Sequence, residues 1–183
     1  MFAGKALRRP SEPETSEEEN TMKRTRRLVL AAFFLLPVLG GIALATPGVN
    51  IIAGPVVARG THAERLNIHS KAGVKVQTKS STDFVTQQIV IGPGGTTGWH
   101  SHPGPVLVTV KSGELTLVYG DDASCQGRIY RAGDSFVDRG DEVVHTALNR
   151  GSTNLEIWAT YFVPGTPGTP QRRDAPNPGS CPF

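Results

Sequence analysis

The feature that most constrains the fold is a succession of short apolar runs in the second half of the chain. The runs, rich in β-branched and aromatic residues, cover 84–91, 106–110, 114–119, 128–131, 135–138, 143–148 and 154–162. The links between them contain Gly, Asp or Asn, which favour turns. Short strands at roughly ten-residue intervals with such links are typical of antiparallel barrels and double-sheet sandwiches. Because no amphipathic helical pattern follows residue 46, we predict an all-β fold, an antiparallel double-sheet β-barrel.

Two histidines lie one residue apart just before the run 106–110. Side chains alternate along a strand, so His100 and His102 project from the same face. Two imidazoles on one face hold a divalent metal ion when a third ligand arrives from elsewhere in the fold, and His145 in the run 143–148 is the candidate. The alternative is a hydrogen-bonded or surface pair that binds no metal.

The N-terminal region has the pattern of an export signal. Residues 1–20 are polar and acidic and are expected to be disordered. A basic segment at 22–27 and an apolar run at 28–45 follow, and the run ends in Ala-Leu-Ala, a small-residue cleavage site. This pattern predicts a secreted, periplasmic or cell-surface protein. Two alternatives stay open: an uncleaved membrane anchor, since the run is near the lower length limit for a span, and a true start at Met22.

The two cysteines of the chain, Cys125 and Cys181, both follow the export pattern. In an oxidising compartment an isolated pair is expected to form a disulfide. Metal ligation by the cysteines is the alternative, but neither has a neighbour at ligand spacing. The disulfide would hold the segment 164–183, whose six prolines predict an extended or irregular tail with no packed element.

Charge and motifs exclude several functions. The chain has 19 Lys/Arg and 16 Asp/Glu, and residues 1–45 contain seven of the basic and five of the acidic residues. The sequence has no stripe of basic residues interleaved with aromatic ones, so nucleic acid is not expected as a partner. Contact with a membrane is expected only through the N-terminal segment. No Ser or Cys nucleophile motif and no phosphate-binding Gly loop followed by Lys occurs. His62 and His69 have no neighbours at metal-ligand spacing. The sequence assigns no catalytic residue.

The chain is long enough for one domain of ordinary size with additional segments at both ends. No internal repeat of fixed period divides it further. We expect five parts: 1–21, disordered or an upstream extension; 22–45, the export signal or membrane anchor; 46–72, a linker with a first strand; 73–163, the barrel; and 164–183, the proline-rich tail tied by the disulfide.

Around the histidine pair the chain resembles the cupin family. The first cupin motif is a Gly, five residues, His-x-His, a Glu three or four residues later, and a Gly after six more. Gly94 matches the opening, the histidine pair matches the centre, and Gly113 falls at the spacing of the closing Gly. The Glu position falls on Val106 or Leu107, so this ligand is missing.

The second cupin motif, a Gly, a Pro-x-Gly turn and His-x-x-x-Asn, also has a counterpart. Gly133 matches its start, and His145 and Asn149 match its end. Arg139 stands in place of the Pro, and the segment is one residue longer than usual. The resemblance covers residues 84–162. It implies that the predicted barrel has the cupin, or jelly-roll, form.

The resemblance further implies that the two motifs lie on neighbouring strands and that His100, His102 and His145 converge inside the barrel mouth. Three nitrogen ligands leave positions open for water or substrate. Imidazole suits Fe, Zn, Mn, Ni or Cu, so the divalent metal ion is not identified. Without the Glu the site is more cationic and should favour a small, anionic ligand. Glu142 is an alternative ligand, although strand alternation points it away from the face of His145.

Three functions stay open. The first is an exported cupin enzyme whose metal, held by the three histidines, supports dioxygenase or isomerase chemistry on a small molecule. The second is a non-catalytic module that binds or senses a small molecule through the same site. The third is a metal-free scaffold. By analogy with other cupins, pairing of sheet edges would give a homodimer.

Overall fold

The computed structural model describes residues 44–183 of the chain. The segment expected to be disordered, and the export signal up to residue 43, lie outside the described residues. Within residues 44–183 the chain forms strands and turns, and no helix there is long and apolar enough to cross a membrane. The strands are β1 (Val49–Ala53), β2 (Val56–His62), β3 (Asn67–His69), β4 (Lys75–Gln77), β5 (Thr82–Thr96), β6 (His100–Ser101), β7 (Val106–Ser112), β8 (Glu114–Tyr119), β9 (Arg128–Arg131), β10 (Ser135–Asp138), β11 (His145–Leu148), β12 (Leu155–Pro164) and β13 (Arg173–Asp174).

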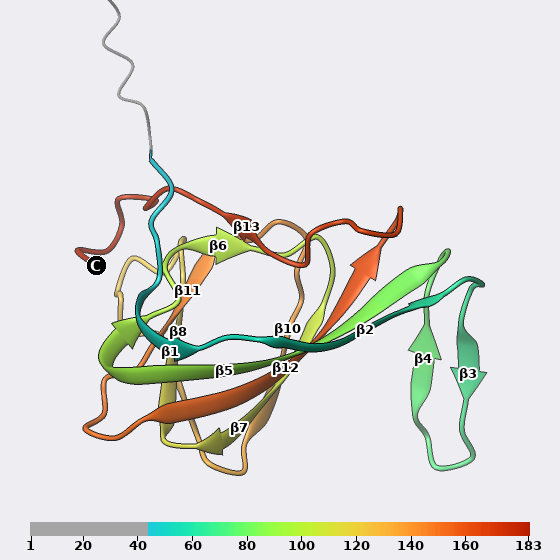
Figure 1. The fold of residues 1–183 in the computed structure, drawn as a ribbon, viewed down its shortest axis with the longest axis horizontal. Helices are drawn as coiled ribbons and strands as arrows, with labels where there is room; N and C mark the ends of the chain where they lie inside the picture. Colours follow the sequence, from blue (N-terminus) through green and yellow to red (C-terminus); the bar gives the residue numbers. More distant parts are fainter. Residues whose placement is uncertain (1–43) are drawn as a thin grey trace, which may run out of the picture. The chain divides into compact units, whose positions relative to one another are not determined.

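Eleven strands form one antiparallel sheet that curls into a nearly closed barrel, so the predicted all-β barrel is confirmed (Figure 1). The sheet runs in the order β10-β7-β12-β5-β11-β6-β13. In addition, β1 and β2 pair with β5, and β8 pairs with β11 and β9. β3 and β4 form a separate two-stranded hairpin, seen on the right of Figure 1. The long strand β5 therefore links the N-terminal strands to the strand that carries His145.

The inner face of the barrel is set by strand alternation, and β12 shows it most plainly. Leu155, Ile157, Ala159, Tyr161 and Val163 are buried, and the residues between them are half-buried. Because successive side chains point to opposite faces, every second residue of this strand enters the core. There they pack against inward residues of β5, β7, β8 and β11. Full burial of one such aliphatic side chain stabilises the fold by about 1.5–3 kcal/mol.

The proline-rich tail is packed, and the prediction that it carries no packed element is therefore wrong. Arg173–Asp174 forms β13, which pairs with β6 (Figure 1). Further along, Cys181 is buried in a cluster with Trp99 and is joined by a disulfide to Cys125. Proline interrupts a strand because it lacks a backbone N–H donor, but β13 lies in a stretch of five residues without proline.

Two strand boundaries also differ from the sequence expectation. The segment 46–72, predicted as a linker with one strand, contains β1 and β2, both paired with β5, and the first strand of the separate hairpin. The run 143–148 starts as a strand only at His145. Before it, Asp141 and Glu142 have positive φ angles of 55° and 59°, a turn conformation that a strand does not allow.

Candidate metal centre

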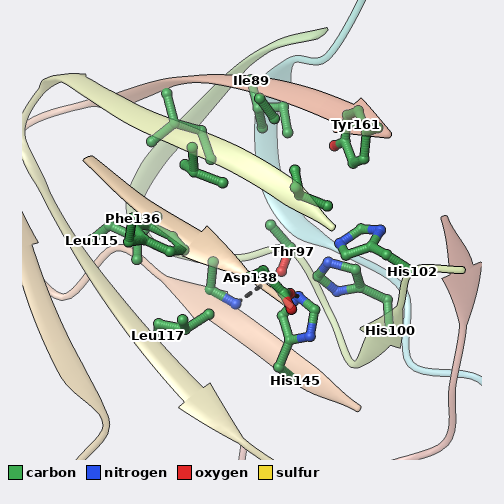
Figure 2. A pocket seen from close by; sticks show the side chains of 15 residues that line it. Ile89, Thr97, His100, His102, Leu115, Leu117, Phe136, Asp138, His145 and Tyr161 are labelled. Atoms are coloured by element: carbon green, nitrogen blue, oxygen red, sulfur yellow. Dashed lines mark hydrogen bonds and ion pairs between the residues drawn. The ribbon is translucent and has the colours of Figure 1, made fainter. Parts of the chain in front are cut away.

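Three histidines meet in the barrel. His100 lies in β6, His102 follows that strand, and His145 begins β11, where it is the register partner of His100. Their ring centroids lie 4.4 Å (His100–His145), 4.8 Å (His100–His102) and 5.1 Å (His102–His145) apart. One side-chain nitrogen of each histidine lies within 4.8 Å of those of the other two, and all three residues are buried (Figure 2). The structure thus brings together the three residues that the sequence singled out.

Backbone carbonyls fix the tautomer of each ring. The Nδ1 atoms lie at hydrogen-bond distance from the carbonyl oxygens of Gly98 (2.8 Å from His100), Gln171 (2.7 Å from His102) and Val143 (3.0 Å from His145). A carbonyl oxygen only accepts, so Nδ1 carries the proton in each ring. In the neutral ring Nε2 is then an unprotonated nitrogen with a free lone pair. Carbonyl partners of this kind orient histidines that bind metals.

The buried surroundings also keep two of the rings neutral. Burial lowers the pKa of His100 well below its usual value, and the neighbouring His145 and Arg172 lower it further. Burial lowers the pKa of His102 to about 4, against the opposing effect of its hydrogen bond to the carbonyl of Gln171. Both imidazoles are therefore uncharged at neutral pH, the form that binds a metal.

In the metal-free protein these shifts predict a loss of stability in acid. Between pH 6.5 and pH 4 the unfolded chain holds a proton on His102 that the folded chain does not, so the free energy of unfolding falls by about 3 kcal/mol as the pH falls through this window. His100 acts in the same direction. Urea unfolding in the presence of a chelator at several pH values measures the effect. A His102→Gln variant should show a clearly smaller slope with pH, and equal slopes would contradict the prediction.

A buried carboxylate that sequence reasoning missed lies next to the histidines. Asp138, at the end of β10, is 2% exposed, and its Oδ2 lies 2.9 Å from Nε2 of His145 (Figure 2). Its Oδ1 accepts a hydrogen bond of 2.8 Å from the backbone N–H of Gly140. Burial acts to raise the pKa of Asp138, but the hydrogen bond and charge of His145 hold it below the usual value. An acidic residue in the predicted strand 135–138 was the available sequence signal.

Two adjoining cavities give access to the cluster. The smaller, of about 40 Å³, contains the three histidines and Asp138 in its wall, which is otherwise mostly apolar (Figure 2). It has room for a few water-sized groups. The larger, of about 340 Å³, shares His100, Thr97 and Tyr161 with the smaller and is bordered by Arg172 of the tail. A volume of this size suits a small organic molecule.

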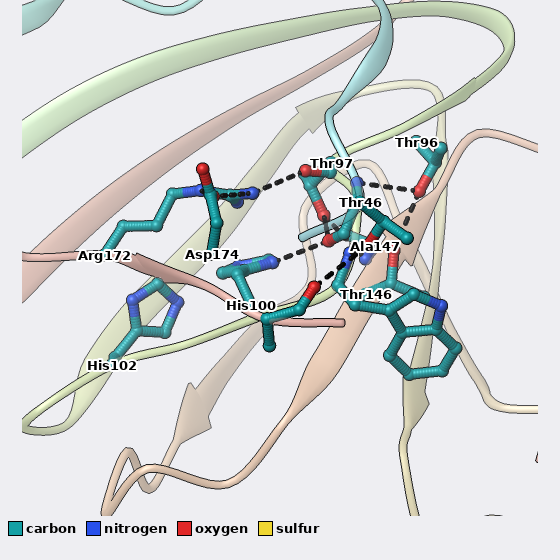
Figure 3. Close-up of polar contacts among 12 residues, drawn as sticks. Thr46, Thr96, Thr97, His100, His102, Thr146, Ala147, Arg172 and Asp174 are labelled. Atoms are coloured by element: carbon teal, nitrogen blue, oxygen red, sulfur yellow. Dashed lines mark hydrogen bonds and ion pairs between the residues drawn. The ribbon is translucent and has the colours of Figure 1, made fainter. Parts of the chain in front are cut away.

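The segment that leads into the histidine pair is fixed from several parts of the chain (Figure 3). The N–H of Trp99 donates to Oγ1 of Thr46 at 2.8 Å. Thr97 donates its N–H to the carbonyl of Ala147 at 2.9 Å and accepts the N–H of Ala147 on its Oγ1 at 3.0 Å. Arg172 donates to the carbonyl of Thr97 at 2.8 Å. The position of His100 thus depends on Thr46 before β1, on β11 and on the tail.

The tail contacts both histidines of the pair. Gln171 supplies the carbonyl that fixes His102, and Asp174 is the register partner of His100. At the end of the chain the carbonyl of Phe183 accepts a 2.8 Å hydrogen bond from Nε1 of Trp99, and the two aromatic rings stack with centroids 6.1 Å apart. The last residues of the chain are therefore part of the structure around the site.

The remaining sequence candidates lie away from the cluster. Glu142 is 46% exposed, accepts a 2.8 Å hydrogen bond from Ser101 and pairs with Arg173. It is not part of the histidine cluster, but the reason differs from the predicted strand alternation, because Glu142 lies in the turn before β11. His62 and His69 are exposed on β2 and β3.

A comparison with known protein families matches the part of the chain that contains the site. The family described as cupin domain matches residues 87–163, a range that includes the three histidines and Asp138. No curated protein matches the sequence.

Several solved structures are similar to the chain. An uncharacterized conserved protein with a double-stranded β-helix domain from Klebsiella pneumoniae is 24% identical, with 61% of this chain and 84% of that chain covered and a TM-score of 0.42. A cupin-like protein from Thermotoga maritima is 21% identical, with 51% and 65% covered and a TM-score of 0.42. The polyketide cyclase RemF from Streptomyces resistomycificus is 20% identical, with 50% and 59% covered and a TM-score of 0.40.

Proposed function

The chain belongs to the cupin superfamily through residues 87–163, and on that premise we propose that it is an exported protein that holds a divalent metal ion and acts on a small molecule. The ligands in this proposal are His100, His102 and His145. The disulfide between Cys125 and Cys181 is compatible with an oxidising, extracytoplasmic compartment and supports export.

One observation carries the metal proposal. In each of the three buried rings a backbone carbonyl binds Nδ1, so the nitrogen left free to bind a metal is Nε2 in every case. These three imidazole nitrogens border one mostly apolar cavity together with the carboxylate of Asp138, an arrangement in which a cation can bind to all of them. The donor set therefore fits a first-row divalent ion such as Fe, Zn, Mn, Ni or Cu.

The finer proposal is an enzyme of the dioxygenase or isomerase type. A divalent ion bound by three histidines supplies Lewis-acid polarisation or oxygen activation at its remaining positions. The mostly apolar wall of the smaller cavity lowers the local dielectric constant and so strengthens electrostatic interactions with a bound group. Tyr161 donates its hydroxyl to Gln87 at 2.8 Å, and burial raises its pKa, so it stays protonated and acts as a fixed wall of both cavities.

The second candidate function is non-catalytic binding or sensing of a small molecule. The wall of the smaller cavity favours this function, because its ionisable residues are the three histidines, Asp138 and Tyr161. A site with so few groups able to move a proton suits retention of a ligand as well as its conversion. Oxygen uptake or turnover with candidate substrates separates this function from the enzyme.

The metal proposal is tested by the metal content of the chain purified without added metal. We expect about one equivalent of divalent metal in the parent and none in a His100→Ala/His145→Ala double variant, because one remaining imidazole cannot hold the ion. A His62→Ala/His69→Ala double variant is the matched control, since both of its histidines are exposed, and it should keep the metal. No metal in the parent, even after reconstitution with each of the five ions, would overturn the proposal.

A further inference from the structure

We infer that Asp138 is a fourth metal ligand and supplies, from a different strand, the carboxylate that the first cupin motif lacks in this chain. This inference rests on the proposed function, because it extends the same metal site. It assigns a role to a residue that lies 38 positions after His100, at a place where neither cupin motif has a metal ligand.

The sheet register places Asp138 directly beside the missing Glu position. That position falls on Val106 or Leu107, of which Val106, at the start of β7, is buried and Leu107 is exposed. β10 pairs with β7 antiparallel, and Asp138 is the register partner of Val106. Residues directly opposite each other on an antiparallel pair project from the same face of the sheet. Both residues are buried and line the cavity that contains the histidines. A carboxylate at Asp138 in β10 therefore faces the same cavity as a Glu at position 106 in β7 would.

The contact between Asp138 and His145 places a carboxylate oxygen next to a nitrogen of the histidine cluster. Nδ1 of His145 is engaged by the carbonyl of Val143, so in the neutral ring Nε2 carries a lone pair toward Oδ2 of Asp138 at 2.9 Å. Two electron-rich atoms at this distance repel each other unless a proton or a metal cation lies between them, and a bound metal would take the place of that proton. Apart from this contact with His145, no hydrogen-bond donor among residues 44–183 serves Oδ2, although the atom is fully buried. The free oxygen therefore lies where it and Nε2 can bind one ion.

The loop after β10 holds the carboxylate in this position. Gly140 donates its N–H to Oδ1, which leaves Oδ2 for the cluster. Gly140 has a φ of +72°, and a Cβ atom there would lie 2.2 Å from the carbonyl oxygen of Gly104, so only glycine fits. Three nitrogens and one carboxylate oxygen form a ligand set that first-row divalent ions accept. The carboxylate also returns the negative charge that the absent Glu removes from the site.

The test is the affinity of the full chain for Co²⁺, measured by competition with a chelator, together with the visible spectrum of the bound ion. We expect Asp138→Asn to weaken Co²⁺ binding at least about 100-fold, which is more than the loss of a residue that only orients a ligand would cause. The visible spectrum should also change, because an oxygen ligand is lost. Asp141→Asn, at an exposed aspartate three residues later, is the matched control and should match the parent. A Val106→Glu/Asp138→Asn double variant should recover affinity, because it restores the family position.

The outcomes separate this inference from the proposed function. If the parent binds Co²⁺ and Asp138→Asn binds it with equal affinity and an equal spectrum, Asp138 only pairs with His145 and the inference is overturned, whereas the three-histidine site stands. If the parent binds no Co²⁺, both fail. Thermal unfolding of the metal-free variants shows whether the fold is kept. A weaker affinity with an unchanged metal-free melting temperature supports ligation.

Discussion

Removal of the disulfide is expected to lower the free energy of unfolding by about 4 kcal/mol and to weaken metal binding by at least about tenfold. The double change Cys125→Ser/Cys181→Ser opens a loop whose ends are 56 residues apart, which gives the unfolded chain more conformational freedom. The effect on the metal follows from the tail, because Gln171 then holds His102 only through non-covalent contacts.

Chemical unfolding of the double variant and of the parent, each with and without a chelator, measures the first effect, and competition for Co²⁺ measures the second. Reduction of the parent by a phosphine should reproduce the variant, which separates loss of the bond from the change of side chain. An unfolding free energy within about 1 kcal/mol of the parent, with unchanged Co²⁺ affinity, would show that the non-covalent contacts of the tail suffice.

Trp99→Ala is expected to cost about 3–5 kcal/mol of folding stability. The side chain is 1% exposed and forms the centre of a small cluster with Val118, Leu148, Ala175 and Cys181. Its loss leaves a cavity in this cluster and removes the hydrogen bond from Nε1 to the carbonyl of Phe183. Since Trp99 directly precedes His100, the affinity for a metal should fall as well.

The chain offers a matched control in its other tryptophan. Trp158 is half-buried on the outward-facing side of β12 and bonds Glu156 on the same strand. Trp158→Ala should cost less than half as much and leave Co²⁺ affinity unchanged. Urea unfolding of the two variants gives the comparison. Equal losses of stability would show that the cluster around Trp99 is not a distinct supporting core.

The barrel and the histidine cluster were predictable because both depend on local patterns. Alternation along a strand needs only the sequence of that strand, and it predicts that His100 and His102 share a face. The third histidine was proposed from its place in the run 143–148, and the second cupin motif, which ends at His145 and Asn149, implied that it meets the pair. Asn149 donates to the carbonyls of Ile91 and Thr153, so this motif residue links β5 to the turn before β12.

Asp138 and the tail could not be predicted because their roles depend on contacts between distant segments. An aspartate at a strand end is usually a turn residue, and only the register of β10 with β7 places this one beside Val106. In the tail, proline content gave the wrong expectation. Propensity describes a segment by itself, whereas Arg173–Asp174 gains its strand geometry from pairing with β6.

The contacts of the tail also set the order in which the site is completed during synthesis. All three histidines have been added to the growing chain by residue 145, but the carbonyl that orients His102 belongs to residue 171, and the strand beside His100 ends at residue 174. The cysteine that anchors this segment is the third residue from the end of the sequence. A chain truncated before residue 164 therefore contains every histidine of the site but lacks the tail contacts that position His100 and His102. We therefore expect the proposed metal site to reach its geometry only after the tail has folded against β6 and its disulfide has formed.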